Sequence, residues 1–195
     1  MKFRIIPWLC LLPMIPLGNA HAHGDVQDRI SKITAEIQTS PAAGLFFRRG
    51  CLHLEHGEAM AALADFENAD RLDPGAFATA PLRAESLMLL GKLPQALRTL
   101  DRYLAQNPAA SRCLVLRART FTRLGDLSAA ARDYQKALAL TPQPEPDLIL
   151  ESATALANDQ RPAEALEILD QGIARLGPLA SLEIPALELD LKNNR

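Results

Sequence analysis

Residues 43–76 read AGLFFRRGCLHLEHGEAMAALADFENADRLDPGA, and the pattern of this stretch returns twice further along the chain. Each return comes 34 residues after the last. A glycine, an alanine and a proline keep the same phase in all three copies. They are Gly57, Gly91 and Gly125, then Ala62, Ala96 and Ala130, then Pro74, Pro108 and Pro142. A period of this length is typical of stacked two-helix units, so the sequence predicts an all-α superhelical solenoid.

We expect the repeat array to span residues 43–179 and to hold about four helix-turn-helix units. The fourth unit is looser than the others. Gln160 stands where the other units have glycine, and the spacing from Pro142 to Pro178 is 36 residues rather than 34. Pro162 is expected to open the second helix of this unit, a position that favours proline. The predicted boundaries are 43–76, 77–110, 111–144 and 146–179.

The composition is that of an ordinary folded protein. Of the 195 residues, 48% are hydrophobic and 23% are charged. The formal net charge of -2 gives no positive field that would favour nucleic acid. The sequence contains no nucleophile elbow, phosphate-binding glycine loop or zinc-binding helix motif. We therefore expect a protein that is not an enzyme, needs no cofactor and has no nucleic-acid partner.

The chain has three cysteines, Cys10, Cys51 and Cys113, too few and too scattered for a disulfide framework. Cys51 and Cys113 fall in first helices two repeats apart, so we expect no bridge between them within one molecule. Each is predicted to be a small buried apolar side chain. A reactive or intermolecular thiol is the alternative.

A positive start, an apolar run and an A-x-A-like end mark residues 1–22 as a secretory signal peptide, cleaved after Ala20 or Ala22. The apolar run is too short to span a bilayer as a helix, and no later segment resembles a membrane span. We therefore expect an exported protein of the bacterial periplasm, with secretion as the alternative.

The array is expected to have a helix at each end. Residues 23–42 would form a linker and a leading amphipathic helix that covers the open end of the first repeat, with Asp25 as its cap. Residues 180–195 would form a closing helix with Pro185 in its first turn, or else a truncated fifth repeat. The apolar stripe of the leading helix is Val26, Ile30, Ile33 and Ile37.

With these features in place, the chain resembles the tetratricopeptide repeat family. In repeat one the family pattern reads Phe46, Gly50, His53, Gly57, Ala62, Phe66, Ala69 and Pro74; in repeat three it reads Leu114, Ala118, Phe121, Gly125, Ala130, Tyr134, Ala137 and Pro142. The resemblance covers roughly residues 43–179 and is specific for the fold. It places a small residue of each first helix against an alanine of the second. The small residues are Gly50, Ala84, Ala118 and Ala153.

Arginines recur in a position where the family usually has leucine. Arg49, Arg83 and Arg117 lie 34 residues apart. A ladder of guanidinium groups could bind an anion. We expect instead that the arginines pair with local carboxylates such as Asp65 and Asp133 and set the packing between helices.

Tetratricopeptide arrays bind extended peptides or partner helices in a concave groove lined by their first helices, so the resemblance implies a scaffold for protein–protein interaction. Arg112, Arg119 and Arg123 follow one helical face. The expected ligand is therefore a peptide with an apolar anchor and an acidic group. The family's carboxylate-clamp positions hold Phe47 and Cys51, which argues against recognition of chaperone C-termini. The groove residues implied by the family are Phe47, Cys51, Leu54, Glu85, Met88, Arg112, Val115, Arg119, Arg123 and Leu150.

Two other functions are open. Cleavage after Ala20 would leave His21 first and His23 third, an arrangement that can chelate copper or nickel through amine, amides and imidazole. The chain would then handle a metal or another small ligand. Alternatively, it is a structural accessory subunit of an envelope complex that uses its ends or its convex surface.

Overall fold

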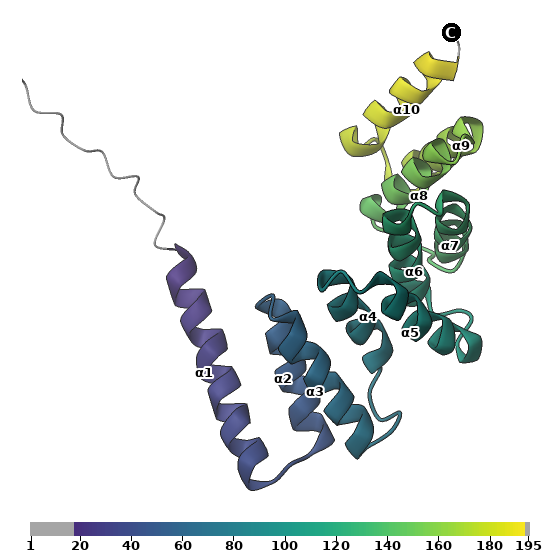
Figure 1. The fold of residues 1–195 in the computed structure, drawn as a ribbon. Coiled ribbons are helices and arrows are strands. Elements are labelled where there is room, and N and C mark those ends of the chain that lie inside the picture. Colours follow the sequence, from purple (N-terminus) through teal and green to yellow (C-terminus); the bar gives the residue numbers. More distant parts are fainter. Residues whose placement is uncertain (1–17, 194–195) are drawn as a thin grey trace, which may run out of the picture.

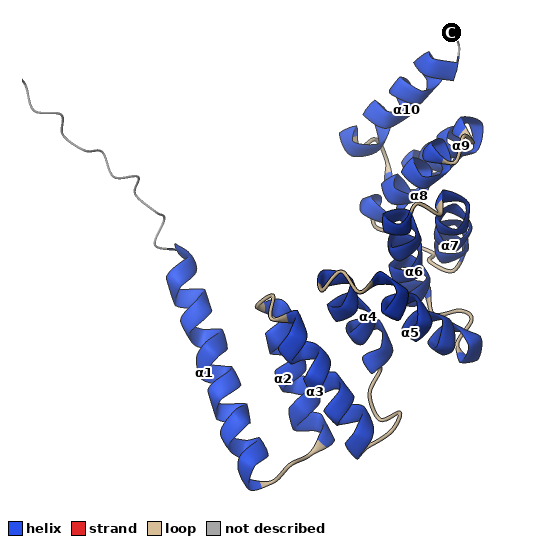
Figure 2. Ribbon diagram, in the orientation of Figure 1, coloured by secondary structure: helices blue, strands red, loops and turns tan. Residues whose placement is uncertain are grey.

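The computed structural model describes residues 18–193, and over these residues the chain forms ten helices and no strand (Figure 2). Short loops join the helices, which is the all-α architecture predicted from the repeat. The helices are α1 (Gly18–Thr39), α2 (Ala43–Glu55), α3 (Ala59–Leu72), α4 (Thr79–Leu89), α5 (Leu93–Gln106), α6 (Ser111–Leu124), α7 (Leu127–Ala139), α8 (Pro146–Asn158), α9 (Pro162–Leu176) and α10 (Ala180–Asn193).

The helices stack in pairs from α1 at one end to α10 at the other (Figure 1). The pairs are α2 with α3, α4 with α5, α6 with α7, and α8 with α9, and each second helix also packs against the first helix of the next pair. Among the first helices, α4 contacts both α2 and α6, and α8 contacts α10. The chain is therefore an α-solenoid with an inner layer of first helices and an outer layer of second helices.

Small side chains let the two helices of each pair approach closely. Gly50 serves the first pair, because a Cβ atom there would lie only 2.8 Å from Cε1 of Phe66. The later pairs use alanines, as the sequence predicted. Ala62, Ala84, Ala96, Ala118, Ala130 and Ala165 are 0% exposed, and Ala153 is 2% exposed. Any larger side chain at these positions would push the helices apart.

The turn inside each repeat needs a left-handed residue. Gly57, Gly91 and Gly125 have φ angles of +78°, +71° and +85°, which confirms the role predicted for them. Gln160 takes the same place in the fourth repeat with a φ of +61°, and it is the one residue other than glycine with positive φ between residues 18 and 193. Pro162 then opens α9, as expected.

The leading helix begins earlier than the sequence suggested. Asp25 lies within α1, which starts at Gly18, so the prediction that Asp25 caps this helix is wrong. The helix continues through both expected cleavage positions. Ile30 and Ile33 are buried together with Leu52 of α2, so the apolar stripe of α1 does pack on the first repeat. Residues 1–17 lie outside the described part of the chain, and the signal peptide stays a prediction.

The closing helix α10 packs its Leu182 and Ala186 into the apolar cluster formed with α8 and α9. Pro185 lies inside this helix rather than in its first turn, which corrects the sequence-based expectation. A proline removes the N–H that would bond the carbonyl four residues earlier. That carbonyl belongs to Ser181, an exposed residue, so the missing bond can be replaced by water and the helix continues past the proline to Asn193.

Candidate partner-binding groove

The predicted groove residues lie on the first helices, which form one layer of the solenoid. Phe47, Cys51 and Leu54 are on α2. Glu85 and Met88 are on α4, and Leu150 is on α8. The other four predicted residues are on α6, namely Arg112, Val115, Arg119 and Arg123.

A pocket of about 310 Å³ lies where α2, α4 and α6 meet, and we call it the central groove pocket. It brings together four of the predicted residues from three helices. Leu82, which the sequence analysis did not single out, adds apolar surface. The lining residues are Cys51, Leu54, Glu55, Leu82, Glu85 and Arg112.

A second pocket of about 310 Å³ lies between α1 and α2, and it shares Cys51 and Glu55 with the first. The sequence analysis did not single out three cations of this N-terminal groove pocket, in part because it treated α1 only as an end cap. Arg29 and Lys32 come from α1, and Arg48 comes from α2. The i, i+3 spacing of Arg29 and Lys32 beside the buried Ile33 was the available signal.

Leu150 lines a third pocket, of about 240 Å³, between α8 and α10. Thr154 of α8 and Pro185, Glu188 and Lys192 of α10 share this wall. The contribution of α10 could not be read from the repeat period, because α10 belongs to no complete repeat. The groove layer therefore carries pockets at its N-terminal, central and C-terminal parts.

Three of the predicted groove residues are largely used in packing. The ring of Phe47 stacks on Phe77 with centroids 4.7 Å apart and also meets Phe66. Met88 is 8% exposed and belongs to the core cluster around Leu100 and Leu114. Val115 is half-buried between the core clusters of the second and fourth repeats. Their contribution to a ligand surface is correspondingly small.

The three predicted arginines of α6 do not form a free basic face. Arg112 donates to the carboxylate of Glu85 at 3.0 Å. Arg119 donates two hydrogen bonds of 2.8 Å to Glu151, which also accepts from the hydroxyl of Tyr134. Hydrogen bonding to Glu151 raises the pKa of Arg119, and burial raises the pKa of Tyr134.

Arg123 differs from the other two arginines. Its Nη1 donates to the backbone carbonyl oxygen of Met88 at 2.7 Å, a bond that orients the side chain without neutralising it. Of the three arginines of α6, two therefore pair with carboxylates, and Arg123 bonds to a backbone carbonyl instead. Sequence spacing predicted the shared helix but could not show which carboxylates the fold brings to each arginine.

The recurring arginines Arg49, Arg83 and Arg117 are paired with carboxylates of the chain itself. Arg49 donates to both oxygens of Asp65 at 2.8 and 2.7 Å. Arg117 donates to Asp133 at 2.6 and 2.8 Å and to Asp101 at 2.7 Å. Hydrogen bonds to these aspartates raise the pKa of both arginines. The predicted pairing with Asp65 and Asp133 is confirmed.

Arg83, the middle of the three arginines, pairs with a carboxylate at a different position. The position that holds Asp65 and Asp133 in the neighbouring repeats is Thr99 in this one. Arg83 therefore reaches to α3, where it donates to Asp70 at 2.9 Å. We call each of these three arginines, together with its carboxylates, an arginine rung.

The family assignment rests on a sequence match. Residues 82–145 match the sequence model of the tetratricopeptide repeat. This match covers about a third of the chain and identifies these residues as tetratricopeptide repeats. Solved structures of such proteins share its fold over most of its length. The sequence has no significant match among curated proteins.

Three of these structures illustrate the likeness. MamA from Desulfovibrio magneticus RS-1 is 16% identical, with a TM-score of 0.68 over 91% of this chain and 92% of that one. TTC0263 from Thermus thermophilus is 18% identical, with a TM-score of 0.64 over 89% and 94%. YrrB, a repeat protein described as having an unusual peptide-binding site, is 17% identical, with a TM-score of 0.66 over 88% and 86%.

Cys51 and Cys113 of the array are free thiols. Cys113 is buried, as predicted, whereas Cys51 is only partly buried because it lines two pockets, so the prediction is wrong for Cys51. Burial is the main cause that raises the pKa of each thiol, so both are protonated at neutral pH.

Other predictions lie partly beyond the described side chains. His21 and His23 fall in the first turns of α1, but their side chains lie outside the described part, so metal binding there stays a prediction. Elsewhere in residues 25–192, no group of His, Cys, Asp or Glu could hold a metal ion. None of the helices between residues 18 and 193 is both long and apolar enough to cross a membrane.

Proposed function

We propose that this chain is an exported, non-enzymatic scaffold that binds a peptide or a partner helix along its first-helix groove. The observation that supports this most is the central groove pocket, where three successive first helices bring apolar and charged side chains together. Pockets of this kind, with apolar walls and a few polar groups, are the usual form of a recognition site.

An apolar side chain of the ligand would lie between Leu54 and Leu82, beside the thiol of Cys51. An acidic group of the ligand would bind Arg112. The side chains of Arg112 and Glu85 are 63% and 40% exposed, and an exposed ion pair of this kind is worth only about 0–1 kcal/mol. A ligand carboxylate can therefore replace Glu85 at small cost.

Further cations would guide the two ends of the ligand. Arg123 forms no ion pair with a carboxylate among the described residues, and its hydrogen bond goes to the backbone carbonyl of Met88. Arg29, Lys32 and Arg48 form no ion pair among the described residues, and they line the N-terminal groove pocket together with Glu36 and Glu55. A peptide that spans both pockets would place its apolar anchor near Cys51 and acidic residues on either side.

The peptide-binding site described for YrrB supports a peptide ligand for this fold, although the two chains share only 17% of their residues. Export is supported by the pattern of residues 1–22, and we propose the periplasm as the location. Sequencing the N-terminus of the protein recovered from a periplasmic fraction tests export. An intact Met1 in that fraction would contradict it.

The groove proposal is tested with a displayed library of random peptides. Peptides are selected on the wild-type chain and then measured on the double variant Glu85→Arg/Arg112→Glu, which keeps the ion pair but reverses its direction. We expect selected peptides to be acidic beside an apolar residue and to bind the double variant about tenfold more weakly, as expected for one charged hydrogen bond.

Arg132→Glu is the matched control, because Arg132 is an exposed arginine of the outer helix α7. It should leave peptide binding unchanged. Peptides that bind the wild type and the double variant equally would overturn the groove proposal. The accessory-subunit alternative, which uses the ends or the convex surface, would then be favoured.

A further inference from the structure

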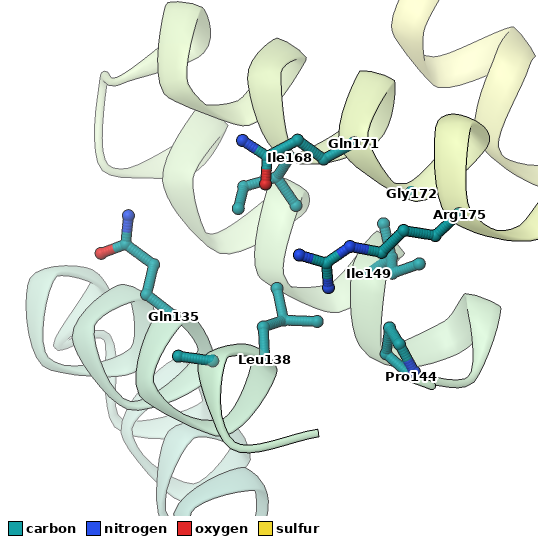
Figure 3. A pocket seen from close by; sticks show the side chains of 9 residues that line it. Gln135, Leu138, Pro144, Ile149, Ile168, Gln171, Gly172 and Arg175 are labelled. Atoms are coloured by element: carbon teal, nitrogen blue, oxygen red, sulfur yellow. The ribbon is translucent and has the colours of Figure 1, made fainter. Parts of the chain in front are cut away.

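A separate pocket of about 190 Å³ lies in the outer layer, between α7, α9 and the start of α8 (Figure 3). None of its lining residues belongs to the groove helices α2, α4 and α6. Its wall combines apolar and polar side chains. Leu138, Ile149 and Ile168 supply apolar surface, and the polar side chains around them are Gln135, Gln171 and Arg175.

The pocket occurs at the junction where the ladder lacks an arginine rung. One repeat earlier, Arg117 joins Asp133 of its own repeat to Asp101 of the preceding one. In the repeat register set by the buried alanines, the corresponding residues of the next junction are Ser152, Ile168 and Gln135 in that order. The guanidinium and both carboxylates are thus replaced by shorter or neutral side chains.

Two of the three replaced positions, Ile168 and Gln135, line the pocket. The third, Ser152, is 0% exposed, and its hydroxyl has no hydrogen-bond partner among the described residues. Pro144, in the two-residue insertion before α8, forms another part of the wall. The space therefore has a structural cause: the side chains that close the preceding junction are missing here.

The lining of the pocket carries a positive charge, while the carboxylates of Glu167 and Glu164 contact its two glutamines from outside the lining. Arg175 is its single charged lining residue, and this side chain forms no ion pair or hydrogen bond within residues 25–192. In Figure 3 its guanidinium extends from α9 over the apolar wall. The amide nitrogens of Gln171 and Gln135 donate to Glu167 and Glu164 at 3.1 and 3.5 Å, which leaves their amide oxygens as acceptors.

We propose that this outer pocket binds the C-terminal residue of a partner protein, with an apolar terminal side chain against Leu138, Ile149 and Ile168 and the terminal carboxylate on Arg175. The volume of 190 Å³ is below the roughly 300–1,000 Å³ of sites for drug-sized ligands, so it suits one residue rather than a cofactor. This site is independent of the first-helix groove.

A C-terminal residue fits this chemistry better than an internal acidic residue. The terminal carboxylate and the apolar side chain share one Cα atom, so a single residue can contact both Arg175 and the apolar wall of the pocket. An aspartate or glutamate side chain would pair with Arg175 but leave the apolar wall exposed to water. The backbone N–H of the terminal residue can also donate to an amide oxygen of Gln135 or Gln171.

The test uses N-acetyl-glycyl-leucine as the probe, with its C-terminal amide as the comparison ligand. Both are titrated into the ¹⁵N-labelled full chain, and the backbone amide signals of Gln171, Gly172 and Arg175 are followed by NMR. We expect saturable shifts with the free acid and binding about tenfold weaker for the amide, because the charged hydrogen bond is lost.

Arg175→Gln should weaken binding of the free acid to the level of the amide. Arg132→Gln, which removes an exposed arginine of α7, should leave binding unchanged, as should the groove variant Glu85→Arg/Arg112→Glu. Equal binding of the two probes, shifts that do not saturate, or a full response in Arg175→Gln would each overturn the proposal.

Discussion

The third and fourth repeats have the same helical architecture but differ in their polar residues. Both pairs of helices cross at two buried alanines, Ala118 with Ala130 in the third repeat and Ala153 with Ala165 in the fourth. The third repeat adds an arginine rung, a turn glycine and a side-chain cap. The fourth has none of these in the same places.

This difference shows that the small-residue contact, rather than the polar features, defines the repeat. Two helices can cross closely only where their side chains are small, and few residue types are small enough. Several residue types can occupy a left-handed turn or a polar junction with only a modest loss of stability. The fourth repeat therefore diverges at these positions and keeps its alanines.

The largest expected effect follows from enlarging the shared contact. Ala130→Leu and Ala165→Leu should each lower the free energy of unfolding by about 1–3 kcal/mol through overpacking. Denaturant unfolding followed by circular dichroism measures this. Ala174→Leu, at an exposed position of α9, is the control and should have little effect. Similar stability of all three variants would show that the alanine contact is not what defines the repeat.

The arginine rung should matter only where its carboxylate is present. Arg117→Ser leaves Asp133, which is 7% exposed, without its partner, and should cost about 1–2 kcal/mol after allowance for the partial exposure of Arg117. Arg117→Ser/Asp133→Ile copies the fourth repeat and should recover most of that loss. A double variant less stable than Arg117→Ser, measured by the same unfolding curves, would contradict this account.

The third and fourth repeats also differ in the residue that precedes the second helix, and here the expected effect is smaller. Asp126 accepts a hydrogen bond of 3.0 Å from the backbone N–H of Ala129, so Asp126→Ala should cost about 1 kcal/mol. Arg161 holds the same position in the fourth repeat and instead pairs with Glu164 on the surface. Arg161→Ala should not change thermal unfolding measurably. A larger loss from Arg161→Ala than from Asp126→Ala would reverse the comparison.

The smallest expected effect is a gain. Gln160→Gly should raise the free energy of unfolding by about 0.5–1 kcal/mol, because glycine adopts a φ of +61° without strain. Gly125→Ala should lower it by a similar or larger amount, although a Cβ atom there would meet nothing within 4 Å. If both substitutions left the melting temperature unchanged, the left-handed turn would carry no strain.

Much of the fold was predictable, because the repeat period reports local geometry that each unit must reproduce. The alanines, the turn glycines and the pairing of Arg49 and Arg117 all follow from position within the repeat. The start of α1 and the position of Pro185 in α10 could not be predicted in this way, because these two helices are not part of the 34-residue repeats. No second copy of those helices exists to reveal their register.

The site was predictable only in part for a related reason. Family positions identify Cys51, Leu54, Glu85 and Arg112, which the fold does bring to one pocket. They do not show that Glu151 takes up Arg119, because that pair joins α6 to α8 across repeats. The outer pocket lies where Ile168 and Gln135 replace the two aspartates of the preceding junction, and such a loss of charged residues produces no sequence motif.

The most direct test of the groove uses Cys51, which lines both the central and the N-terminal groove pockets. The full chain is alkylated with N-ethylmaleimide with and without a saturating selected peptide, and modification of each cysteine is followed by mass spectrometry of its tryptic peptide. Cys113, which is 2% exposed, serves as the unreactive internal reference. Slower alkylation of Cys51 in the presence of peptide is the result we predict. Alkylation of Cys51 at the same rate with bound peptide would contradict binding in the groove.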